Sequence, residues 1–120
     1  MASKPPPIYY TPLPTDLTPE EANVIQYHRR NLDAGTYLTN PDGTPTTFKG
    51  AVMGTDKGAM LFPTYWHGVV MEPRTAFTMA NRSGISFPEY KDTDTALARE
   101  QILHKVMEAD SRAFMKRKKK

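Results

Sequence analysis

The chain contains no cysteine, and this absence excludes several kinds of site at once. Its 120 residues can form no disulfide, no cysteine-ligated zinc site and no thiol nucleophile. No apolar run approaches the roughly 20 residues that a membrane span needs, and residues 1–7 lack the apolar stretch of a secretory signal. We therefore expect a soluble protein that does not follow the general export route and has no membrane partner.

Apolar residues are scarce, at 38% of the chain, whereas prolines are plentiful, at 11. This composition favours a modest core with extended segments attached to it, within a single domain. The net charge of +3 hides an asymmetry, because residues 112–120 hold six cations and no acid. The remaining 111 residues hold ten cations and thirteen acids, so the basic character belongs to a tail and not to a basic face.

Residues 1–17 are predicted to form an extended arm, because five of the eleven prolines lie there. Prolines at this density fit neither a helix interior nor a strand ladder. One interpretation is a disordered leader, and the other is an arm that docks on its own domain or on a partner. Apolar side chains favour docking, and the predicted protein-interface residues are Ile8, Tyr9, Tyr10 and Leu13, with Leu17 behind them.

Residues 18–115 are predicted to form a single α+β domain. Thr18 can cap a helix over residues 19–33, which begins with Pro19 and stops at Gly35. Turn signals at residues 40–43 and 54–58 then divide the following segment into short strands. The predicted strands are residues 37–39, 46–53 and 59–62, which we expect to pair as a three-stranded antiparallel meander.

Two further helices complete the predicted fold. The first opens at Pro73 and stops at Gly84, and the second runs from about Thr95 to Phe114 behind an aspartate cap. The apolar stripe of this last helix is read from spacings of three and four, at Leu97, Ile102, Leu103, Val106, Ala109, Ala113 and Phe114. The expected fold class is α+β, a small three-stranded antiparallel meander packed by about three helices, with an extended proline-rich N-terminal arm.

The histidines do not form a recognisable catalytic or metal site. His28, His67 and His104 stand in no metal-ligand spacing, and no acid accompanies them in a known pattern. The chain also lacks a nucleophile elbow and a phosphate-binding glycine loop. We therefore predict no catalytic residue, no metal ligand and no cofactor, and we expect that the protein is not an enzyme.

Two segments have both a structural and a functional interpretation. Tyr65 and Trp66 could form an aromatic platform for bases or sugars, but in a chain with so few apolar residues we expect them to fill the core. The basic tail, residues 116–120, could contact phosphate through Lys116, Arg117, Lys118, Lys119 and Lys120. A charge run at a helix end is more often a solvated tail that also suits the helix dipole.

Four short motifs follow one another in a fixed order. They are Asn-Pro-Asp-Gly at 40–43, Pro-Thr-Tyr-Trp-His-Gly at 63–68, Gly-Ile-Ser-Phe-Pro at 84–88, and a helix start at 93–97 with His104 beyond it. On these motifs, residues 37–109 resemble a short module that recurs in bacteriophage and prophage proteins. The resemblance implies a phage-encoded protein, often one carried in the virion, and it implies no catalytic residues.

The sequence therefore favours a small virion or virion-assembly structural protein that acts by binding other virion proteins. Such a protein would be assembled in the host cytoplasm and located in the virion. The alternative is a small phage protein of the host cytoplasm that binds nucleic acid or a host enzyme through its basic tail.

Overall fold

A computed structural model describes residue 10 and residues 12–118 of the chain. Within these residues, three helices and seven short strands follow one another. In chain order they are α1 Pro19–Ala34, β1 Leu38–Thr39, β2 Pro45–Thr46, β3 Gly50–Thr55, β4 Gly58–Pro63, β5 Tyr65–Trp66, β6 Val69–Val70, α2 Pro73–Arg82, β7 Glu89–Tyr90 and α3 Thr93–Lys118.

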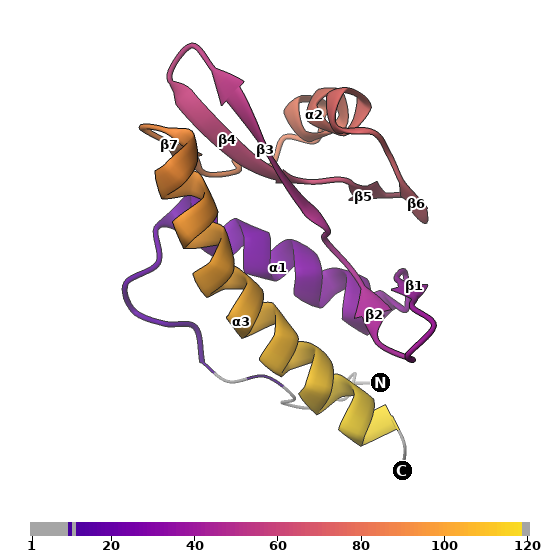
Figure 1. Cartoon of the computed structure of the whole chain (residues 1–120). Coiled ribbons are helices and arrows are strands. Elements are labelled where there is room, and N and C mark those ends of the chain that lie inside the picture. Colours follow the sequence, from indigo (N-terminus) through magenta and orange to yellow (C-terminus); the bar gives the residue numbers. More distant parts are fainter. Residues whose placement is uncertain (1–9, 11, 119–120) are drawn as a thin grey trace, which may run out of the picture.

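The main sheet is antiparallel, with β4 between β3 and β7. Helix α2 packs on one side of it, and α1 and α3 lie side by side on the other (Figure 1). Residues 59–63 of β4 are all buried, as expected for a strand that is covered on both faces. The predicted fold class is confirmed, since the chain is α+β with a three-stranded antiparallel sheet and three helices.

The third strand of this sheet is not the one that the meander prediction named. The segment that contains β1 folds back through the Asn-Pro-Asp-Gly turn onto β2 and forms a separate two-stranded sheet. The free edge of β4 is taken instead by β7, which follows α2 in the chain. Pairing of β7 depends on how α2 returns the chain to the sheet, and local turn signals carry no information about that.

Local sequence signals predict both ends of α1 but not the C-terminal end of α3. Thr18 and Glu21 form a reciprocal capping box at the start of α1, and Gly35 ends the helix with φ 72°. Helix α3 continues to Lys118, beyond the predicted end at Phe114. Methionine, lysine and arginine are good helix formers, and cations are favourable near the negative end of the helix dipole.

Among the described residues, no helix combines the length and apolar character needed to cross a membrane.

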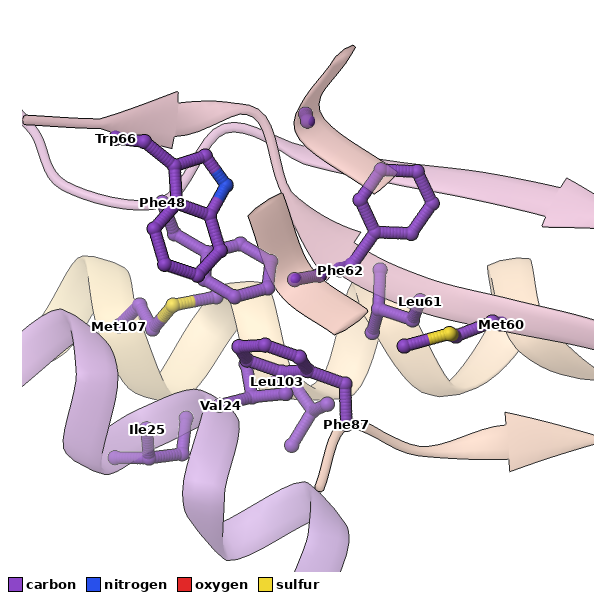
Figure 2. Close-up of a cluster of buried hydrophobic side chains, with 12 residues drawn as sticks. Val24, Ile25, Phe48, Met60, Leu61, Phe62, Trp66, Phe87, Leu103 and Met107 are labelled. Carbon is purple, nitrogen blue, oxygen red and sulfur yellow. The ribbon is translucent and has the colours of Figure 1, made fainter. Parts of the chain in front are cut away.

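The core is a cluster of aromatic, aliphatic and methionine side chains between the sheet and the helices (Figure 2). Trp66 is 6% exposed and donates its indole N–H to the Pro63 carbonyl at 2.8 Å. Tyr27 and Phe87 meet the Trp66 ring edge to face. The expectation that Tyr65 and Trp66 fill the core is therefore confirmed.

The buried face of α3 differs from the predicted stripe. Leu97 and Ile102 are 48% and 41% exposed, so both of them face outward. The buried positions are Ala96, Leu103, Met107 and Asp110. Their spacings of seven, four and three residues describe one narrow face. The prediction was wrong at the two outward positions because it scored only hydrophobic residues and excluded an aspartate from the buried face.

Candidate functional site

Two buried carboxylates join α1 to α3, and sequence reasoning assigned a tertiary contact to neither. Glu21 accepts from Arg99 Nε at 2.8 Å and Nη2 at 2.9 Å, and from the Tyr90 hydroxyl at 2.7 Å. It also accepts the Thr18 backbone N–H at 3.0 Å. Burial raises the pKa of Glu21, but the hydrogen bonds from Arg99, Thr18 and Tyr90 outweigh it and lower this pKa to about 2.

The second carboxylate, Asp110, lies on α3, about three turns beyond Arg99. It accepts from Arg29 Nε at 2.8 Å and from Arg29 Nη2 at 3.2 Å. His28 Nε2 lies 3.5 Å from Asp110 Oδ2, and His28 Nδ1 is within hydrogen-bond distance of the Thr47 hydroxyl. Burial raises the pKa of Asp110, but His28 and Arg29 together hold it below its usual value.

Both clusters have a structural explanation, because each carboxylate is enclosed and fully engaged with a cation from the facing helix. An acid on the buried face of a helix is the signal that could have revealed them. Asp110 stands three residues after Met107 and seven after Leu103, in register with the core. Glu21 is visible in the sequence only as a capping residue.

The described part of the predicted arm lies against its own domain. The Tyr10 hydroxyl donates to Asp33 Oδ1 at 2.6 Å, and the Arg29 guanidinium lies over the Tyr10 ring, 4.8 Å from its centroid. Burial, together with the hydrogen bond to Asp33, raises the pKa of Tyr10. Leu13 and Leu17 pack against the core cluster. Two of the predicted interface residues, Ile8 and Tyr9, lie outside the described residues.

The predicted phosphate contacts are only partly described. Lys116 is exposed on the last turns of α3, and the backbone of Arg117 and Lys118 continues the helix. Lys119 and Lys120 lie outside the described residues. The structure therefore places the start of the basic run on a helix, directly after the part of α3 that packs on the body.

The three histidines lie in three different environments. His28 is buried in the Asp110 cluster, and His67 stands in the turn between β5 and β6 with φ 50°. His104 is exposed, with its Nδ1 3.9 Å from Glu100 one helical turn away. Across residues 10 and 12–118, no group of three potential metal ligands comes together.

The described surface is hollowed by a groove beside the C-terminal half of α3. It has a volume of about 1090 Å³. Helix α3 forms one wall, and the opposite wall is the β1–β2 turn with the segment that leads into β3. Figure 1 shows this hairpin beside the lower turns of α3. We call this hollow the α3 groove.

Apolar side chains and opposite charges share the lining of the α3 groove. The apolar contributions come from Pro45, Phe48, Met107 and Met115. The charged and titratable residues are His28, Asp42, Lys49, Glu100, His104, Glu108, Arg112 and Lys116. Within this set, Glu108 pairs with Arg112 at 3.4 Å. The α3 groove therefore offers an apolar floor with charges of both signs along its rim.

The polar end of the groove is held in place by the Asp110 cluster. His28 of α1 and Thr47, from the segment before β3, both line the groove and contact each other. Asn31 donates its side-chain N–H to the Thr47 carbonyl at 2.8 Å. The buried cluster thus fixes the distance between α1, α3 and the segment that forms the groove's opposite wall.

Comparison of the chain with protein-family models, with curated proteins and with solved structures finds no match.

Proposed function

We propose that this protein is a small bacteriophage virion or virion-assembly protein that acts by binding other proteins, and that it binds them in the α3 groove. The phage origin is supported by the resemblance of residues 37–109 to a module of phage and prophage proteins. Protein binding is supported by the groove itself, which is the observation that carries the proposal.

The size and lining of the α3 groove suit an extended peptide segment. Its volume of about 1090 Å³ lies just above the roughly 300–1,000 Å³ typical of small-molecule sites. Phe48, Met107 and Met115 supply the apolar floor, and methionine adapts readily to different apolar partners. Charges of both signs at the rim can orient a peptide but do not select a strongly acidic or strongly basic one.

One wall of the groove is tied to the rest of the fold, and the other leads into an edge strand. One wall is a continuous helix held to α1 by the Glu21 and Asp110 clusters. The other wall ends at Gly50, the first residue of the edge strand β3. Edge strands are a common place for an extended partner segment to add backbone hydrogen bonds.

Mass spectrometry of purified phage particles tests this proposal. We expect to find both the natural protein and the Gln101→Arg variant in the particles. Gln101 is exposed on α3 and does not line the groove, so this variant is the control. Ser111→Arg places the same cation in the groove wall, and we expect it to reduce incorporation at least tenfold while thermal unfolding stays unchanged. Absence of the natural protein from particles, or equal incorporation of both variants, would contradict the proposal.

Nucleic-acid binding is the second candidate function, and the cations that line the groove favour it. Lys49, Arg112 and Lys116 all line the groove, and α3 carries the chain on into the basic run. Three acids line the same groove, which is why we place protein binding first. This second function would be favoured if retention of the protein on DNA falls steeply as the salt concentration rises. It would be favoured further if this salt dependence is weaker in Lys116→Gln.

A further inference from the structure

The main sheet leaves one edge of β3 open. Strand β3 pairs with β4 along six residues, and no described strand lies on its other side. Its apolar side chains Ala51, Val52 and Met53 are only partly buried, whereas residues 59–63 of β4 are all buried. A further strand at this open edge would therefore cover apolar side chains that the fold of one chain leaves partly exposed.

The backbone of alternate β3 residues points to the open edge. The Leu61 N–H donates to the Pro88 carbonyl, next to β7, at 3.0 Å, so it points away from β3. Leu61 stands opposite Val52. In an antiparallel pair, opposite residues that exchange no bonds with each other direct their N–H and C=O groups away from each other. Val52, with Gly50 and Gly54 two residues to either side, therefore directs these groups to the open edge.

The open edge of β3 lacks the features that keep a sheet edge from pairing with another chain. Protected edges are short, or carry charged residues or proline. The opposite edge of the sheet fits this description, because β7 is only Glu89 and Tyr90, between Pro88 and Lys91. Residues 50–55, in contrast, include no charge and no proline. The sheet is thus protected on the β7 side and open to a further strand on the β3 side.

The sequence of β3 fits a second copy of itself. A two-fold axis through Val52 sets Val52 opposite Val52 of the second copy, and Gly50 opposite its Gly54. Valine favours strand pairing, and glycine in a strand allows another backbone to approach closely. At Gly54 an added Cβ would meet nothing nearer than the Gly58 carbonyl oxygen at 3.9 Å, so there is room at this position.

The charges that flank β3 favour this register. Moving the axis by one residue, to Met53, would set Lys49 opposite Lys57 of the second copy. Like charges directly opposite each other in neighbouring strands are unfavourable. With the axis at Val52, Lys49 stands opposite the uncharged Thr55 instead.

We infer that two copies of this chain pair through the open edges of their β3 strands, antiparallel about a two-fold axis at Val52, and join their main sheets into one. This inference does not rest on the proposed function. The α3 groove ends at Gly50, so the dimer leaves it to a partner segment. A strand of another protein is the competing occupant of the edge, and the isolated protein would then be a monomer.

Sedimentation equilibrium of the full-length natural protein measures the association. We expect a dimer of about 27 kDa, twice the 13.5 kDa of one chain, that dissociates on dilution. Gly54→Pro removes an N–H that points to the open edge and not to β4, so we expect it to raise the dissociation constant of the dimer at least tenfold. Gly54→Ala keeps this N–H and is the control, with a dissociation constant close to the natural value. A natural protein that stays monomeric up to about 0.1 mM, or equal effects of the two variants, would overturn the inference.

Single cysteines test the register, because the chain has no natural cysteine to interfere. Val52→Cys places two thiols opposite each other across the axis, where the Cα atoms lie about 5.5 Å apart, within the range for a disulfide. Gly54→Cys is the matched control, since residue 54 then lies about 13 Å along the strand from residue 54 of the second copy. We expect mild oxidation to link Val52→Cys at least tenfold faster than Gly54→Cys, although residue 54 is the more exposed of the two.

Equal linking of the two cysteine variants would also overturn the inference, because the copies would then meet through another surface or only by collision. If Gly54→Pro does not fold, the mass of the natural protein and the cysteine pair still decide the question. Failure of the dimer can be told apart from failure of the proposed function, because the Ser111→Arg test in particles does not depend on β3.

Discussion

The Glu21 cluster makes a specific prediction about stability in acid. The carboxylate is 1% exposed and receives hydrogen bonds from β7, α3 and the start of its own helix. The net effect is a pKa of about 2 against an ordinary value of 4.5. Because the pKa is lower in the folded protein, the folded state is stabilised when Glu21 is ionised.

The size of this contribution follows from the pKa difference. At about 1.4 kcal/mol per pKa unit, the difference between 4.5 and about 2 corresponds to about 3 kcal/mol. The Arg99 side chain is 24% exposed, so water screens part of the interaction. We therefore expect about 2 kcal/mol, which is a large share of the stability of a domain of this size.

The contribution depends on pH in a defined direction. It is fully present above the unfolded-state pKa of 4.5 and is lost as the pH falls through the folded-state pKa of about 2. Glu21→Gln keeps the shape of the side chain and removes the charge. We expect this variant to be about 2 kcal/mol less stable than the natural protein at pH 7, with the difference shrinking between pH 5 and pH 2.

Urea unfolding monitored at several pH values measures this difference. Glu20→Gln is the matched control, because it removes the same charge from the same first turn of α1. Both variants lose an interaction with the helix dipole, so their difference isolates the contacts of Glu21 to Arg99, Tyr90 and the Thr18 backbone N–H. If Glu21→Gln is no less stable than Glu20→Gln at pH 7, or if its deficit persists at pH 2, the reasoning is refuted.

Two further predictions concern the core and the β3–β4 turn, and urea unfolding measures both. Trp66→Ala should cost about 3–5 kcal/mol, because Trp66 is buried with its N–H bonded to Pro63; Trp66→Phe should cost clearly less, and equal costs would show that the ring's volume is not what matters. Gly58→Ala should cost about 2 kcal/mol or more, because φ is 139° and the added Cβ would lie 2.0 Å from the Tyr90 carbonyl oxygen. Gly54→Ala, whose Cβ would meet only a carbonyl at 3.9 Å, should stay within about 1 kcal/mol, and similar losses for both glycine variants would contradict the steric explanation.

The α3 groove was beyond the reach of sequence reasoning for a geometric reason. Its walls come from residues 40–50 and 100–116, which are far apart in the chain and polar enough to read as ordinary surface. Only the packing of α3 across the sheet brings them together. The described arm contacts are a similar case, because the sequence left open whether the residues before α1 dock on their own domain or on a partner.

The sequence by itself determined the features that depend on near neighbours. The α1 boundaries follow from Thr18, Pro19 and Gly35, because a capping hydrogen bond or a left-handed φ involves groups within a few residues. The burial of Tyr65 and Trp66 also followed from composition, since a small core cannot leave its largest side chains outside.

Only the tertiary structure decided which distant groups meet. Arg99 reaches Glu21 across 78 positions, and Arg29 reaches Asp110 across 81. A carboxylate is favourable in a buried position only when its cation arrives there with it. The sequence displays both charges, but their pairing, like the choice of β7 as the partner of β4, is a property of the assembled fold.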